Sequence, residues 1–244
     1  VTIFTLVFAI SAPLFSIFLS KINVKYTLMV ALFIFIIANI LTALSFSLPI
    51  YLIARAIAGL GAGIFSPMAV STSSQLVENS HKGKALATIV GGMSVGTVVG
   101  VPLGIQISNI SSWRFTLVCI ALLSSVALLL ISIHFKQIFV PSPPSIRARF
   151  NLFINPNIIR VITVTVCAAI SSLGLYTYLS NLVDQYPSVY SIPIYLTIWG
   201  IGGLIGSFGI GFILDKFKST NLIMLSIMVF LLISFILLPF IIQI

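Results

Sequence analysis

Arg55 is the one charged residue that lies inside a long apolar stretch of this 244-residue chain. The other charged residues fall between apolar stretches or within a few residues of their ends. A guanidinium group inside a membrane costs several kcal/mol on most estimates unless it finds a partner, a carbonyl oxygen or water, so an embedded ionisable residue is by default functional. Arg55 is therefore expected to face a cavity or to act in coupling. The alternative is that its long side chain reaches the outer membrane surface.

Glycines at regular spacing form the second candidate site. Gly92, Gly96, Gly100 and Gly104 recur at every fourth position, and Pro102 lies among them. Successive members turn by only about 40° around a helix, so they form one stripe. Small residues at this spacing let a neighbouring helix approach closely, and proline removes a backbone donor and bends a helix. Two interpretations stay open: helix packing alone, or packing that also shapes a transport pathway.

Hydroxyl and aromatic side chains gather in one later apolar stretch, at Ser171, Ser172 and Tyr176. Such groups suit the binding of a small polar or planar solute. Hydrogen bonding between helices and an aromatic belt at the membrane surface explain them equally well. The predicted substrate cavity comprises these three residues and Arg55.

The few acidic residues limit the mechanism. Glu78, Asp184 and Asp215 all lie near the ends of apolar stretches, and no carboxylate lies deep inside one. A proton-driven carrier usually holds an embedded acid that binds and releases the proton. Either that acid belongs to a helix outside this sequence, or the mechanism is not proton exchange.

Metal and cofactor chemistry is not expected. The histidines and cysteines are His81, His134, Cys119 and Cys167, and their spacing matches no metal-ligand motif. The two cysteines lie inside apolar stretches, where cysteine acts as a small core residue. A membrane enzyme would also need His, Asp or Glu clustered at the membrane surface, and the sequence holds no such cluster. We predict no metal site, no cofactor and no enzymatic activity.

The elements that must position these residues follow from composition. The chain is 59% hydrophobic and 6% charged, with a mean hydropathy of +1.25, whereas soluble domains are about 45–50% apolar. In lipid a backbone must satisfy its own polar groups, so each long apolar stretch must be a helix. We predict an all-α integral membrane protein with helices at residues 2–20, 26–47, 49–77, 84–109, 114–135, 158–182, 192–214 and 221–243.

The basic residues predict the orientation of these helices. Of the 12 Lys and Arg residues, ten fall in one alternating set of breaks, Arg114 falls in the other, and Arg55 lies inside the third helix. Cytoplasmic loops collect Lys and Arg, so the first set is expected in the cytoplasm of a multi-pass protein of the cell membrane. The net charge of +9 is then a signal of topology, and no nucleic-acid partner is expected.

Two helical bundles are predicted, at residues 1–135 and 158–244. Residues 136–157 hold a proline cluster and form the cytoplasmic loop between them. Residues 18–29 are similar to residues 213–224, and transporter folds are often built from duplicated bundles. Both chain ends are expected on the outer side, so the chain is expected to be an internal part of a longer protein.

Several segments together resemble the major facilitator superfamily, in its twelve-span drug and metabolite efflux branch. They are residues 12–29, 52–63, 78–87, 91–104 and 111–115. The last two are similar to carriers described as arabinose-efflux-like or purine-efflux-like. The resemblance covers essentially the whole chain, as the second to ninth spans of an expected twelve, and implies a two-bundle transporter.

The resemblance also implies roles for particular residues. Arg55 would take the coupling or gating role of the family's arginine motif. Two departures are Ser20, where many members carry an acid, and Ala58, where many carry a polar residue. The remaining residues implied to act in gating are Gly96, Gly100, Pro102, Gly104, Lys21, Asp215 and Lys216.

The expected function is transport of a small solute by alternating access, with export driven by protons and the carrier acting as a monomer. Purines or nucleosides, sugars and drugs are all open as substrates. The alternatives are an uptake carrier or facilitator of the same fold, and an inactive truncated carrier.

Overall fold

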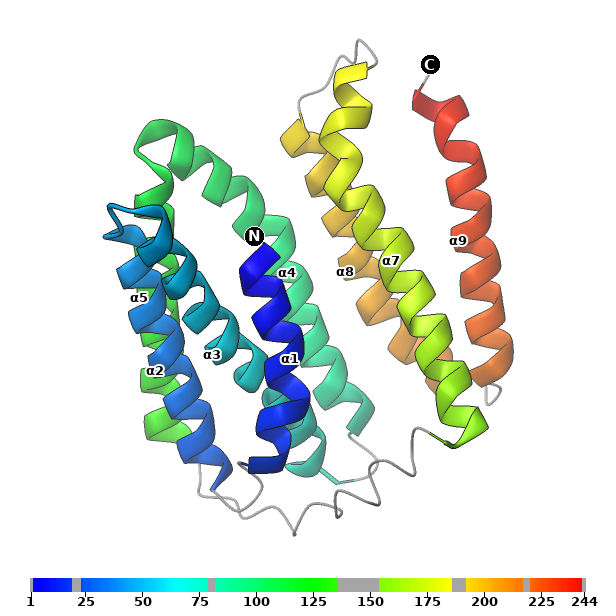
Figure 1. Ribbon diagram of the computed structural model, residues 1–244. Helices are drawn as coiled ribbons and strands as arrows, with labels where there is room; N and C mark the ends of the chain where they lie inside the picture. The colour runs from blue at the N-terminus through cyan, green and yellow to red at the C-terminus, as the bar shows by residue number, and fades with distance from the viewer. Residues whose placement is uncertain are drawn as a thin grey trace. The chain divides into compact units, whose positions relative to one another are not determined.

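The computed structural model describes residues 2–18, 23–78, 82–135, 154–185, 192–216 and 220–242, and every regular element in those residues is an α-helix. Figure 1 shows these helices as long rods. The all-α prediction is confirmed. The helices are α1 Thr2–Phe18, α2 Val24–Ala43, α3 Leu48–Gln75, α4 Lys82–Ile110, α5 Trp113–His134, α7 Pro156–Gln185, α8 Ile192–Lys216 and α9 Thr220–Ile242.

Each predicted helix is present, and the largest difference is at the end of α2. The hydropathy pattern continues it to residue 47, whereas the helix ends at Ala43. The chain turns there because Ser45 bonds back to Thr42: its backbone N–H donates to the Thr42 carbonyl at 3.3 Å and its hydroxyl donates to the same oxygen at 2.7 Å. Local hydrogen bonds from serine offer the backbone an alternative to the helix.

Most of these helices have the length and composition of membrane spans. Among the described residues, five segments are long and apolar enough to cross a bilayer: Val24–Ala43, Leu48–Ser73, Gly83–Ile110, Trp113–His134 and Pro156–Leu179. Three apolar helical segments are shorter: Thr2–Phe15, Ile194–Ile210 and Leu222–Leu238.

The helices group into two compact units. Unit 1 comprises Val1–Ile89 and Leu103–Ile146, and unit 2 comprises Val90–Pro102 and Arg147–Ile244. Helix α4 therefore contributes residues to both units, and its assignment changes after Ile89 and again after Pro102. Bundles at 1–135 and 158–244, joined by a loop at 136–157, stay a prediction.

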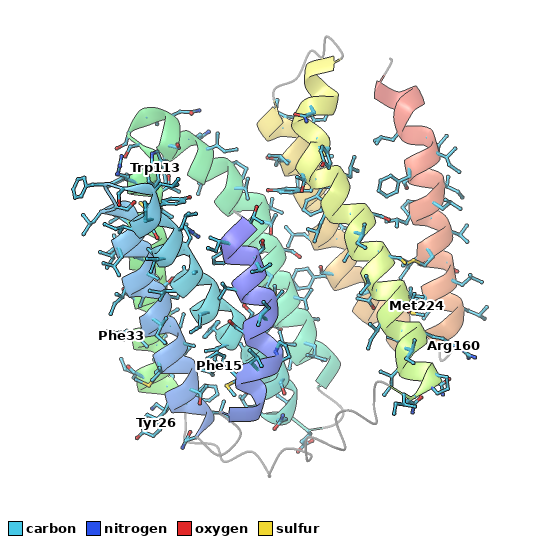
Figure 2. The ribbon with its side chains drawn as sticks, in the orientation of Figure 1. Phe15, Tyr26, Phe33, Trp113, Arg160 and Met224 are labelled. Atoms are coloured by element: carbon cyan, nitrogen blue, oxygen red, sulfur yellow. The ribbon has the colours of Figure 1, made fainter. Side chains whose placement is uncertain are left out.

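Helix α2 is the centre of unit 1. It packs on α3 and α5, and α3 also packs on α1 (Figure 1). The side chains of Asn39 and Thr42 on α2 are the largest that are fully buried. Gly61 lets α3 approach α2, because a Cβ there would lie 2.8 Å from the Ala31 carbonyl oxygen. Figure 2 shows Tyr26 and Trp113 at opposite ends of this unit.

Polar side chains cap several helix starts. Asn23 accepts a hydrogen bond from the Lys25 backbone N–H at 3.0 Å, before α2. Ser112 accepts one from the Phe115 N–H at 3.3 Å, before α5. The first N–H groups of a helix have no partner within the helix, so such a cap defines where the helix begins.

Hydroxyl groups within the helices bond to their own backbone. The Thr42 hydroxyl donates to the Ala38 carbonyl at 2.6 Å, and the Ser11 hydroxyl donates to the Val7 carbonyl at 2.6 Å. Ser124 and Ser171 bond in the same way to the carbonyl one turn earlier. These serines and threonines therefore need no partner on a neighbouring helix.

Candidate functional site

Arg55 lies on α3 in unit 1 and is half-buried. Its guanidinium carbon lies 5.1 Å from the centroid of the Phe4 ring on α1. Phe4 in turn stacks on Phe8, with ring centroids 6.2 Å apart and an interplanar angle of 24°. Cation–π attraction acts over about 6 Å and is strongest away from water. The embedded cation thus contacts an aromatic face, a neighbour that the sequence did not predict.

Two glycines of α3 bring this aromatic pair close. A Cβ at Gly59 would collide with the Phe4 carbonyl oxygen, and it would also lie 3.2 Å from the Phe4 Cα. A Cβ at Gly63 would lie 2.7 Å from the Phe8 carbonyl oxygen. The same sequence offset separates both pairs, so α1 and α3 run parallel. Gly59 and Gly63 are therefore positions where α3 comes close to α1.

The glycine stripe of α4 differs from its prediction. Around Gly92, Gly96 and Gly100, no atom of the described residues lies within 4 Å of a Cβ placed on the glycine. Near Gly104, a Cβ would make ordinary contact with the Thr116 methyl group of α5 at 3.5 Å. Among the described residues, the expected close approach of a helix is therefore not found at the first three glycines, whereas the Gly104 carbonyl accepts a hydrogen bond from the Thr116 hydroxyl of α5 at 3.3 Å. The gating role of Gly96, Gly100, Pro102 and Gly104 stays a prediction.

The close contacts of α4 lie on another face, within unit 2. A Cβ at Gly91 would lie 2.5 Å from the Phe208 ring of α8. On α8, a Cβ at Gly200 would lie 2.6 Å from Val98 of α4. Adjacent residues of a helix point about 100° apart, so the face that holds Gly91 differs from the face that holds Gly92. The spacing of the glycines predicted one stripe on α4, but it did not predict the face of α4 that packs against α8.

The predicted solute-binding residues of α7 also belong to unit 2. The Ser171 hydroxyl donates to the Cys167 carbonyl at 2.9 Å. Ser172 lies one turn before Tyr176 on the same face. Tyr176 contacts the Trp199 ring of α8, with centroids 5.0 Å apart and the planes tilted by 45°. Trp199 is the aromatic neighbour that the sequence analysis missed.

A cavity of about 370 Å³ lies between α2, α3 and α5, inside unit 1. Its lining is mostly apolar, and it does not include Arg55. The lining includes Leu32, Phe35, Ala62, Phe65, Ser66 and Ser124. This cavity is therefore distinct from the predicted substrate cavity. Of the residues predicted to line the substrate cavity, Arg55 belongs to unit 1, and Ser171, Ser172 and Tyr176 belong to unit 2.

Polar contacts join helices at the ends of unit 1. The Arg114 side chain donates to the Ser45 carbonyl at 3.1 Å, and its guanidinium carbon lies 4.6 Å from the Trp113 ring centroid. The Trp113 ring also meets Tyr51 edge-on, with centroids 5.9 Å apart. The ammonium group of Lys25 donates to the Ser132 carbonyl at 2.7 Å. These bonds connect α5 to the two ends of α2.

Three predicted gating residues have side chains outside the described part of the structure. Lys21 lies between the described ranges. Asp215 and Lys216 are the last two residues of α8, and only their backbone is described. Among the described residues, no group of three or more His, Cys, Asp or Glu side chains could hold a metal ion.

Comparison with known proteins gives one family and several relatives. The family model for the Major Facilitator Superfamily matches residues 1–243 of the chain. The uncharacterized MFS-type transporters YbcL and YtbD of Bacillus subtilis (strain 168) are 28% and 26% identical to the chain, over 88% and 83% of it. The inner membrane transport protein YdhP of Escherichia coli (strain K12) is 21% identical over 85% of the chain. The matched segments cover 56%, 51% and 54% of these relatives, so the chain spans about half their length.

Proposed function

Because the chain belongs to the Major Facilitator Superfamily, we propose that the full-length protein is a membrane transporter that moves a small solute by alternating access. The family match over residues 1–243 carries this proposal. The apolar helices support it, since five of those described are long enough to cross a bilayer. The chain spans about half of its relatives, so the proposal concerns the full-length protein.

Arg55 is the proposed coupling residue. It is half-buried within an apolar helix, and the acidic side chain among the described residues, Glu78, lies beyond the end of that helix. A cation in this position responds strongly to a nearby change in charge, because the surroundings screen it weakly. Loading or release of a proton on an acid elsewhere in the protein would therefore alter the position of Arg55.

Export in exchange for protons is the proposed direction. It rests on the resemblance of the α4 glycine motif to that of antiporters. In this mechanism the two bundles rock about a central site. Gating is assigned to Gly96, Gly100, Pro102 and Gly104 of α4, and to Lys21, Asp215 and Lys216 at the cytoplasmic side.

A planar solute is the proposed cargo, with purine bases or nucleosides ahead of sugars. Tyr176 and Trp199 offer two aromatic rings from different helices, 5.0 Å apart. Tyr176 lies three residues before Leu179, where the apolar span of α7 ends, and Trp199 lies in the first third of α8. Ser172, one turn from Tyr176, supplies a hydroxyl for hydrogen bonding, and Ser171 and Arg55 complete the proposed substrate set.

Inverted membrane vesicles provide the test. The full-length protein is expressed, an inside-acid gradient is imposed, and uptake of radiolabelled adenine, uridine and arabinose is followed. Proton-driven export predicts accumulation of a planar solute that an uncoupler abolishes. Arg55→Ala should remove accumulation while the amount of folded protein in the membrane is unchanged. Gradient-independent equilibration would identify a facilitator, and no movement of any solute would contradict the proposed cargo.

The remaining expectations concern the whole molecule. We propose a monomer in the cell membrane without cofactor or enzymatic activity. Light scattering of the full-length protein in detergent measures the mass of the particle. A particle of twice the protein mass would contradict the monomer.

A further inference from the structure

The Phe4 ring lies under the only arginine that the sequence places inside a membrane-spanning stretch. The Arg55 guanidinium carbon lies 5.1 Å from the ring centroid, within the range of about 6 Å over which cation–π attraction acts. We propose that Phe4 is a positioning residue, whose aromatic face holds the Arg55 cation in the orientation that coupling needs. This inference rests on the proposed coupling role of Arg55.

The contact matters because Arg55 lies in an apolar stretch of α3, where Tyr51, one turn earlier, also interacts with it electrostatically. The acidic side chain in the described part of the chain is that of Glu78, which lies beyond the end of α3. A cation away from water must find compensation. The negative face of an aromatic ring provides it without a hydrogen bond, so the guanidinium stays free to donate to a solute or to a carboxylate that becomes charged.

Close packing of α1 against α3 holds the Phe4 ring in place. A Cβ at Gly59 would collide with the Phe4 backbone, so α1 and α3 touch at this level. The Phe8 ring stacks on Phe4, with centroids 6.2 Å apart. Phe4 therefore has little room to move away from Arg55, and the helix pair presents the ring as a fixed surface.

An aliphatic side chain would fill the same space but would lack the electrostatic attraction. This difference separates positioning from packing. Fluorine atoms withdraw electron density from the ring face while changing its volume little, so stepwise fluorination weakens the cation–π contact and leaves packing nearly intact.

The experiment places mono-, di- and trifluorinated phenylalanine at position 4 of the full-length protein. Gradient-driven transport in vesicles is expected to fall step by step with fluorination. Phe4→Leu should lower the rate roughly fivefold to thirtyfold, the change that loss of a desolvated cation–π contact of about 1–2 kcal/mol produces. Phe4→Trp should retain transport. The half-maximal proton concentration should shift in the same order, which a purely structural role would not cause.

Position 33 is the matched control, because the Phe33 side chain is exposed on α2. Fluorination there should leave transport unchanged. If fluorination at position 4 leaves transport unchanged while Arg55→Ala abolishes transport, the positioning role is overturned and the proposed function still holds.

A measurement without transport separates the two proposals further. Melting temperatures of Arg55→Ala, Phe4→Leu and the double variant in detergent form a double-mutant cycle. Non-additive shifts are expected, because each single variant already removes the shared contact. Additive shifts would overturn the contact itself, whatever the transport result. If the shifts are non-additive but Arg55→Ala transports normally, the proposed coupling function fails, and the positioning role fails with it.

Discussion

Ser94 on α4 and Ser207 on α8 lie with their hydroxyl oxygens 3.1 Å apart. Each hydroxyl also bonds to the carbonyl one turn earlier in its own helix, Ser94 to Val90 at 3.1 Å and Ser207 to Gly203 at 2.6 Å, so either serine can be the donor between the helices. Gly91 faces Phe208 and Val98 faces Gly200 on either side of this pair. Residue numbers rise along α4 as they fall along α8, so the two segments run antiparallel. Their register within unit 2 is set by one polar contact and two close approaches.

The first prediction tests this register at Gly200. Gly200→Ala would place a Cβ 3.0 Å from the Val98 Cα, so α8 would have to move away from α4. We expect a loss of about 1–3 kcal/mol in unfolding free energy, measured by thermal unfolding in detergent. Gly203→Ala is the control, because no described atom lies within 4 Å of its new Cβ. Equal stability of the two variants would contradict the contact.

The second prediction compares Gly59 with Gly100. Gly59→Ala would collide with the Phe4 backbone and should cost about 1–3 kcal/mol of stability. Gly100→Ala has open space among the described residues and should gain up to about 1 kcal/mol from helix propensity. If Gly100 acts in gating, transport by the stable Gly100→Ala variant should nevertheless fall. A Gly100→Ala variant that is less stable than the Gly59→Ala variant would contradict this prediction.

The third prediction concerns the end of unit 1 near Trp113. Arg114→Ala removes the hydrogen bond to the Ser45 carbonyl and the contact with the Trp113 ring. Stability should fall by about 1–3 kcal/mol. Arg160→Ala removes an equal charge from an exposed position of α7 and should change stability by less than about 0.5 kcal/mol. Chemical unfolding followed by circular dichroism makes the comparison, and matching losses would show that only net charge matters.

The fourth prediction uses Trp199 as its own reporter. In a Trp113→Phe variant of the described chain, Trp199 is the remaining tryptophan, since the sequence holds 2. In the full-length protein, any further tryptophan is also replaced. A planar solute that stacks on Trp199 should quench its fluorescence, and Tyr176→Leu should weaken binding by about 0.5–1.5 kcal/mol. Quenching that is equal for adenine and arabinose would count against an aromatic platform.

The fold was predictable because lipid leaves few choices. A chain with 6% charged residues must bury its backbone polar groups in helices, and each predicted helix is present. The end of α2 was mispredicted by four residues, because hydropathy does not register the bond from Ser45 to the Thr42 carbonyl. A serine after a long apolar stretch is a signal that could correct the boundary.

The site was predictable only in part. Arg55 stands out because a charge in an apolar stretch is rare, whereas its partner Phe4 is one of 19 phenylalanines and carries no local mark. Phe4 and Phe8 share the spacing of Gly59 and Gly63, and this match of large and small residues on two helices is a signal that could have paired them. Trp199 needed knowledge of which helices are neighbours, which the periodicity of one helix does not contain.

The hydroxyl groups that bond to their own helix have a mechanical consequence. Thr42, Ser124 and Ser171 keep their hydrogen bonds whichever surface lies beside them. A helix of this kind can exchange one neighbour for another, or for an acyl chain, without breaking a polar bond. Movement of such helices past each other costs mainly shape complementarity, so the steps of the proposed transport cycle would need little energy while the backbone stays rigid.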